Sequence, residues 1–172
     1  MRKMLFFFFC LNSIIGEAQE AKPYETIQQN GIVIPVFHFD EFEKILKLNN
    51  DTLYIINFWA TWCQPCVAEL PHFEQLNDSL KNKKAKIILV SIDSRKTAEA
   101  KLVPFLERKN LNNTVWLLNE PDFNSWLNKV SPEWSGSIPA TIMIKGNQNH
   151  FYEQSFEFDH LKKITYQNLN QP

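Results

Sequence analysis

The sequence predicts an α/β fold in which a mixed central sheet is flanked by helices. Short apolar segments rich in β-branched and aromatic residues alternate with longer segments of helical periodicity, a pattern typical of strands covered by helices on both faces. Near the C-terminus two strand segments are separated only by Gly146-Asn147, so a hairpin makes the sheet mixed. The length of 172 residues and the hydrophobic share of 44% suit one domain with its own core.

Residues 1–18 have the pattern of a secretory signal peptide. Arg2 and Lys3 are basic, and residues 4–16 are apolar but too short for a membrane span, which needs about 20 residues. Small residues then offer a cleavage site at about Ala18. We expect a periplasmic or otherwise extracytoplasmic protein with no stable membrane span after cleavage. An uncleaved anchor is the alternative.

The predicted domain spans residues 31–172, and a short segment, residues 19–30, precedes it. Residues 19–30 are polar, and we expect them to form a mobile lead-in. Residues 31–39 are β-branched and aromatic, but Pro35 within them favours an edge strand or a hairpin over a central strand.

The remaining segments continue the alternation of helices and strands. Asp40 is a suitable N-cap for a short helix. The basic stretch 81–86 is more typical of a solvated connection than of a binding patch. Helices are expected at 41–48, 63–80, 94–109 (kinked or broken at Pro104), 123–130 and 159–169, and strands at 52–60, 87–92, 115–118, 140–144 and from 151.

The charge and the cysteine count exclude several classes of protein. A net charge of −1 gives no electrostatic footprint for nucleic acid. Three cysteines are too few for a disulfide scaffold, and Cys10 leaves with the signal peptide. The remaining pair, Cys63 and Cys66, could supply half of a zinc site, but the four histidines are scattered and we expect no metal and no cofactor. A purely structural disulfide is a weak alternative, because so small a ring removes little chain entropy.

The cysteine pair lies where a buried strand ends and a helix begins. In open α/β sheets, functional sites gather at the carboxyl ends of strands. Cys63 would lie at the free N–H end of the helix, where the helix dipole stabilises a thiolate and lowers its pKa. Cys66 lies one turn further in and is more shielded. We therefore expect Cys63 to attack a partner disulfide and Cys66 to resolve the mixed disulfide, while Pro65 stiffens the first turn.

An acid lies on the apolar side of this helix. On a helical wheel Glu69 falls at about 240° from Cys63, within the stripe that Cys66 and Leu70 share. One interpretation is a carboxylate at the helix edge that extends to water. The other is a partly buried carboxyl group with a raised pKa that moves protons for Cys66.

The stretch from Phe58 to Cys66 (FWATWCQPC), together with residues 138–141 (IPAT), resembles the thioredoxin superfamily. Glu69 followed by Leu70-Pro71 is similar to the extracytoplasmic TlpA/ResA-type thiol–disulfide oxidoreductases. The resemblance covers roughly residues 30–169. It implies a thioredoxin-like fold with an N-terminal β-hairpin and an insertion after the second core strand, at 94–115.

The resemblance also implies site residues. Cys63 and Cys66 would form the redox-active disulfide, and Glu69 would be the acid near it. The resemblance further implies a cis Ile138–Pro139 bond lying against the disulfide, although from the residues alone such a bond is ordinarily trans. The expected substrate-binding residues are Trp62, Gln64, Pro65, Ile138 and Pro139.

The sequence departs from cytoplasmic thioredoxins at Asn57, which occupies the position of their buried aspartate. That acid's part in proton transfer does not carry over, and Glu69 is a candidate to replace it.

We expect a reductant of protein disulfides, because Gln64-Pro65 lacks the histidine that favours the reduced form in oxidising relatives. Expected partners are client protein disulfides, with apocytochrome c or another oxidoreductase as candidates, and an upstream thiol electron donor. The alternatives are a thioredoxin-fold binding module with vestigial cysteines, a net oxidant of client thiols and, more weakly, a peroxidase. The sequence leaves two points open: the oligomeric state, and whether Trp134 lines a client groove or packs inside.

Overall fold

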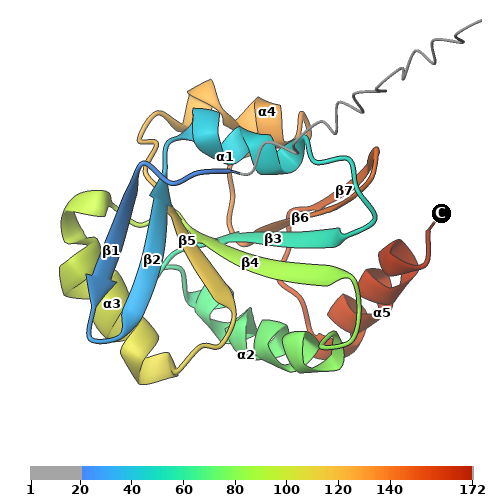
Figure 1. Cartoon of the computed structure of the whole chain (residues 1–172), viewed down its shortest axis with the longest axis horizontal. Helices are drawn as coiled ribbons and strands as arrows, with labels where there is room; N and C mark the ends of the chain where they lie inside the picture. Colours follow the sequence, from blue (N-terminus) through green and yellow to red (C-terminus); the bar gives the residue numbers. More distant parts are fainter. Residues whose placement is uncertain (1–20, 172) are drawn as a thin grey trace, which may run out of the picture.

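The computed structural model describes residues 21–171, in which a seven-stranded mixed sheet separates two layers of helices (Figure 1). The sheet order is β1-β2-β5-β4-β3-β6-β7. The strands are β1 (Glu25–Gln29), β2 (Ile32–Phe37), β3 (Leu53–Trp59), β4 (Ala85–Ser91), β5 (Thr114–Leu118), β6 (Ala140–Lys145) and β7 (Gln148–Tyr152). This confirms the predicted α/β class, the mixed sheet and the hairpin near the N-terminus.

Helices α1 and α4 cover one face of the sheet, and α2, α3 and α5 cover the other (Figure 1). Two 3-10 turns, η1 (Arg95–Thr97) and η2 (Phe123–Ser125), precede α3 and α4. The helices are α1 (Phe39–Leu46), α2 (Gln64–Ser79), α3 (Ala98–Lys109), α4 (Leu127–Val130) and α5 (Phe158–Leu169).

Strand β3 is the centre of the fold, and all seven of its residues are buried. It pairs in parallel with β4 and antiparallel with β6. Successive side chains of a strand point to opposite faces, so Ile55 and Trp59 pack under α2 and α3, whereas Ile56 and Phe58 pack under α1 and α4. Asn57 shares the face of Ile55 and Trp59 and therefore points toward α2.

The N-terminal hairpin begins earlier than the sequence predicts. Residues 25–29, expected to belong to a mobile lead-in, form β1 and pair with β2 from Glu25↔Val36 to Gln29↔Ile32. Only Ile27 of β1 is buried, so this edge strand depends on backbone pairing and shows little apolar pattern. The turn is Asn30-Gly31, with φ of 52° and 80°, and this dipeptide is itself a strong hairpin signal that our prediction missed.

Of the two alternatives predicted from Pro35, an edge strand or a hairpin, the structure shows the hairpin; β2 is not an edge strand, because it lies between β1 and β5. Pro35 pairs only with β1, opposite Thr26. The ladder with β5 begins after the proline, at Val36 and Phe37. The missing N–H of Pro35 therefore faces no β5 partner, which lets a proline stand in an interior strand.

Several element boundaries also differ from the predicted ones. Helix α1 begins at Phe39, and His38, not Asp40, is its N-cap; the Glu41 side chain accepts the His38 backbone N–H at 3.1 Å. Strand β4 takes in Ala85 and Lys86 from the basic stretch, and β7 begins at Gln148 and ends at Tyr152 rather than starting at 151. Helix α3 runs through Pro104 without a break, whereas the segment 123–130 divides into η2 and α4.

The predicted signal peptide, residues 1–18, lies outside the described residues. Within residues 21–171, no helix is both long enough and apolar enough to cross a membrane.

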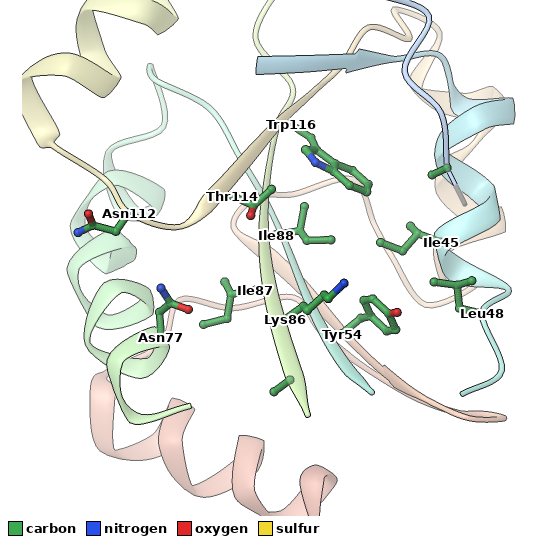
Figure 2. A pocket seen from close by; sticks show the side chains of 12 residues that line it. Ile45, Leu48, Tyr54, Asn77, Lys86, Ile87, Ile88, Asn112, Thr114 and Trp116 are labelled. Atoms are coloured by element: carbon green, nitrogen blue, oxygen red, sulfur yellow. The ribbon is translucent and has the colours of Figure 1, made fainter. Parts of the chain in front are cut away.

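A cavity of about 470 Å³ lies beside the first residues of β3 and β4 (Figure 2). Tyr54, Lys86 and Trp116 line one part of it, and Asn77 and Asn112 line another. Because Tyr54 is near the start of β3 and the cysteines follow its end, this cavity lies at the opposite end of the strand from the cysteine pair.

Replacement of Gly31 by alanine tests the hairpin turn. A Cβ at this position meets no atom within 4 Å, so the cost comes from the positive φ alone. We expect Gly31→Ala to lower the free energy of unfolding by about 1 kcal/mol, measured by urea denaturation. Gln28→Ala, an exposed change in the same hairpin, should stay within about 0.5 kcal/mol. Equal stability of the two variants would contradict the strained turn.

Candidate functional site

The cysteine pair lies at the junction between β3 and α2. After Trp59 the chain makes a turn that is closed by a hydrogen bond from the Cys63 N–H to the Ala60 carbonyl (3.1 Å). Cys63 is the N-cap of α2, with extended backbone angles, and Pro65 lies in the first turn of the helix. Cys63 and Cys66 form a disulfide with their Cα atoms 5.3 Å apart. The Cys66 N–H donates to the Cys63 sulfur at 3.3 Å.

The two cysteines differ slightly in their exposure to solvent. Cys63 is 6% exposed and Cys66 is fully buried. A molecule arriving from solution therefore meets Cys63 first, which agrees with the order of attack and resolution expected from the sequence.

The strand β6 brings a second segment to the disulfide. The Ile138–Pro139 bond, just before β6, is cis, as the resemblance implies. The Cys63 sulfur lies 3.7 Å from the Ile138 carbonyl oxygen. Pro139 is buried and Ile138 is half-buried, so Ile138 is the member of this pair that solvent can reach.

The surface beside Cys63 is formed by three of the predicted substrate-binding residues. Trp62 is 67% exposed, the largest exposed fraction of any large hydrophobic side chain in the described part of the chain. Gln64 and Pro65, in the first turn of α2, are also exposed. The exposed indole therefore forms an apolar surface next to Cys63.

Glu69 lies on the buried face of α2, one turn beyond Cys66, and is only 2% exposed. Its Oε1 accepts a hydrogen bond from Asn57 Nδ2 (2.9 Å), and its Oε2 accepts one from the Phe156 N–H (2.8 Å). The interpretation in which this carboxylate extends to water is therefore wrong. Burial raises the pKa of Glu69 to about 7, and the two hydrogen bonds and the nearby His72 oppose that rise.

Asn57 joins three elements through one amide group. Its Nδ2 donates both to Glu69 on α2 and to Thr141 Oγ1 on β6 (3.1 Å), and Asn57 and Thr141 are direct partners in the β3–β6 pairing. The Asn57 Oδ1 atom is buried and has no hydrogen-bond partner among the described residues. The residue that departs from the thioredoxin pattern is therefore in direct contact with the acid proposed to replace the missing aspartate.

Two acids near the site were not singled out from the sequence. Asp93, just after β4, accepts hydrogen bonds from the backbone N–H and the hydroxyl of Thr61. Glu153, just after β7, accepts hydrogen bonds from Ser135 and Ser137 in the loop before Ile138. For Asp93 a signal existed: an acid directly after a buried parallel strand is a site candidate. For Glu153 we find no such signal.

Trp134 packs inside, which settles a point that the sequence left open. It is buried against Phe58, Trp126 and Phe151, and its Nε1–H donates to the Ser137 carbonyl at 2.8 Å. Trp134 therefore packs beneath the loop before Ile138, on its core side, and offers no surface to a client. No cluster of three or more potential metal-ligating side chains occurs within residues 21–171.

The geometry defines a thioredoxin-like fold with a disulfide at the start of a helix, and comparison with known proteins agrees. This chain belongs to the AhpC/TSA family, whose family model matches residues 26–149. It is 49% identical over 93 residues to the thiol-disulfide oxidoreductase ResA of Oceanobacillus iheyensis, covering 54% of this chain and 44% of that protein. It is 28% identical over 92 residues to ResA of Geobacillus kaustophilus, covering 54% and 48%. The chain thus spans about half the length of these curated relatives.

Solved structures share the fold at low sequence identity. A thiol:disulfide interchange protein of Chlorobium tepidum has a TM-score of 0.58 at 18% identity and covers 70% of this chain and 82% of its own. A secreted thiol-disulfide isomerase of Corynebacterium glutamicum has a TM-score of 0.58 at 15% identity and covers 86% and 82%. These likenesses show the thioredoxin-like fold.

The raised pKa of Glu69 predicts a pH-dependent stability. The folded protein holds the proton up to about pH 7, whereas the unfolded chain releases it near pH 4.5. The stability associated with this proton is fully present below about pH 4.5 and is lost as the pH rises to about 7, on the order of 3 kcal/mol in total. Urea denaturation across this range should show the loss in the wild type but not in Glu69→Gln.

The measured quantity is the difference between the wild type and Glu69→Gln in how steeply the free energy of unfolding changes with pH. Comparison with the variant removes the contributions of other acids such as Asp51, whose pKa is lowered mainly by its hydrogen bond with Lys84. Parallel pH profiles for wild type and Glu69→Gln would show that Glu69 titrates normally in the fold.

Proposed function

We propose that this protein is a thiol–disulfide oxidoreductase that reduces protein disulfides through Cys63 and Cys66. The observation that carries the proposal is the unequal access to the two sulfurs. Cys63, which is 6% exposed and caps the N-terminus of a helix, is bonded to the fully buried Cys66, and its sulfur lies next to the carbonyl of Ile138. The names of the curated ResA relatives support the same activity.

The proposed exchange has two steps and starts from the reduced pair. The Cys63 thiolate attacks one sulfur of a client disulfide, forms a mixed disulfide and releases one client thiolate, which takes up a proton from water. Cys66 then loses its proton and attacks the Cys63 sulfur, which re-forms the Cys63–Cys66 disulfide and releases the second client thiolate. The client gains two electrons, the cysteine pair loses two, and an upstream thiol donor restores the reduced state.

Glu69 is the proposed proton acceptor for Cys66. Residues three apart on a helix are neighbours, and both side chains lie on the buried face of α2. Because Cys66 is fully buried, water gives it little help in losing a proton. A carboxyl group whose pKa is about 7 can exist in either protonation state near neutral pH, which suits it for accepting and returning that proton.

The second proposed role of the site is to hold an extended client segment. Trp62, Gln64 and Pro65 would contact the client on one side of Cys63, and Ile138 and Pro139 would contact it on the other. The half-buried Ile138 offers backbone groups close to the reacting sulfur, which suits a strand-like client.

Reduction is the proposed net direction. The residues between the cysteines, Gln64 and Pro65, include no histidine to stabilise the Cys63 thiolate, so the disulfide form is relatively favoured and the reduced pair donates electrons. Clients such as apocytochrome c or another oxidoreductase fit this direction.

We also propose an extracytoplasmic location, on the basis of the signal-like residues 1–18. The Corynebacterium glutamicum structure is described as that of a secreted protein, which supports the proposal by analogy. In an oxidising compartment a dedicated reductant needs a continuous electron supply, so the upstream donor is part of this proposal.

Insulin reduction tests the activity. With dithiothreitol as donor, the wild type should accelerate reduction of insulin disulfides, whereas Cys63→Ser should fall to the uncatalysed rate because no attacking sulfur remains. Pre-reduced Cys66→Ala, mixed with insulin in the absence of dithiothreitol, should complete only the first step and accumulate a mixed disulfide, visible by non-reducing electrophoresis. Equal rates for wild type and Cys63→Ser would favour a binding module with vestigial cysteines.

The reduction potential tests the direction. Equilibration with glutathione, followed by thiol trapping, should place the Cys63–Cys66 couple nearer the value of thioredoxin, about −270 mV, than that of the strong oxidant DsbA, about −120 mV. A potential close to −120 mV would instead identify a net oxidant of client thiols.

A further inference from the structure

The exchange steps leave Asp93 without a role, although it is a buried acid beside the site. It is 4% exposed and follows β4, next to the end of β3. A backbone hydrogen bond from the Ile92 N–H to the Trp59 carbonyl (2.9 Å) joins these two strand ends. No ion pair involves Asp93 within residues 21–171, so hydrogen bonds alone compensate for the burial of its carboxylate.

Three donors converge on this carboxylate. Asp93 Oδ1 accepts from the Thr61 hydroxyl at 2.7 Å. Asp93 Oδ2 accepts from the Thr61 backbone N–H at 2.9 Å and from the Ser91 hydroxyl at 2.8 Å. Both oxygens are engaged, and two of the three donors belong to Thr61.

The residue held in this way precedes the reacting residues directly. Thr61 lies within the turn from Ala60 to Cys63, immediately before the exposed Trp62. Trp62 is the exposed residue of this turn, Thr61 is half-buried, and one backbone hydrogen bond closes the turn. The two bonds from Thr61 to Asp93 attach this turn to the carboxyl end of β4, and so limit where the indole of Trp62 can lie.

We propose that Asp93 is a positioning residue for client binding: through Thr61 it holds the indole of Trp62 beside Cys63, so that the protein favours client disulfides flanked by apolar residues. This inference rests on the proposed exchange activity. It assigns Asp93 no part in proton transfer, because its partners are two hydroxyl groups and a backbone amide. Its effect should therefore appear in the recognition of a protein client and not in sulfur chemistry.

Two variants of Thr61 form a matched pair. Thr61→Val keeps the shape and the backbone N–H but removes the hydroxyl, whereas Thr61→Ser keeps both donors. The substrates are insulin, which can cover Trp62, and hydroxyethyl disulfide, which is too small to do so. We expect Thr61→Val to lower kcat/KM for insulin about tenfold, mainly through KM, because a hydrogen bond to a charged acceptor is lost. Thr61→Ser should stay within about twofold of the wild type, and hydroxyethyl disulfide should distinguish neither variant from it.

A Trp62→Ala background identifies the route of the effect. If Asp93 and Thr61 act through the indole, Thr61→Val should cause no further loss of insulin reduction once Trp62 is absent. Asp93→Asn, which removes the negative charge of the acceptor, should follow the same substrate pattern. Thermal unfolding of each variant confirms that the folded protein is being assayed. If Asp93→Asn fails to fold, Thr61→Val still tests the inference, because it removes only one hydrogen bond.

The outcomes separate this inference from the proposed function. Equal insulin kinetics for Thr61→Val and Thr61→Ser would overturn the positioning role while leaving the exchange activity intact. So would an equal loss with both substrates, or a loss that persists in Trp62→Ala. A wild type that reduces neither substrate would overturn the proposed function and this inference together.

Discussion

The antiparallel pairing of β3 with β6 is the constraint on which the site depends. Phe58 pairs with Ala140 and Asn57 with Thr141, so the end of β3 meets the start of β6. The chain leaves β3 toward Cys63 at this end, and it enters β6 through Ile138 and Pro139. A shift of one residue would turn every β6 side chain to the opposite face of the sheet. The contact between the Cys63 sulfur and the Ile138 carbonyl therefore follows from strand register.

The same register accounts for polar groups inside the core. Burying a carboxyl group is costly unless hydrogen bonds compensate for the lost water, and Glu69 has two such bonds. One donor, Asn57, is held by β3, and the other, the Phe156 N–H, comes from the segment between β7 and α5. The position of Glu69 one turn beyond the buried Cys66 is what supports the role in exchange that we propose for it.

Two loops lie beside the disulfide, and buried or surface carboxylates hold each of them through hydrogen bonds. Asp93 fixes the turn before Cys63, and Glu153 binds Ser135 and Ser137 in the loop before Ile138. Trp134, buried beneath that loop, adds a hydrogen bond to the Ser137 carbonyl. Both sides of Cys63 are thus formed by loops whose backbones are hydrogen-bonded to the protein, which would lower the cost of ordering them in the client complex that we propose.

The sequence by itself determined the α/β class, the cysteine pair at a helix start and the presence of an acid within that helix's apolar stripe, but not whether this acid is buried. Each of these features follows from the spacing of residues that are close together in the sequence, either the periodicity of apolar residues or the three-residue separation of neighbouring side chains on a helix. Only the tertiary structure decided that Asn57 and Phe156 bind Glu69, that Asp93 holds Thr61, that Pro35 stands in an interior strand and that Trp134 is buried. These features depend on which strands lie side by side and in what register. They involve residues far apart in the chain, and the local sequence around one such residue does not show which distant residues it will contact.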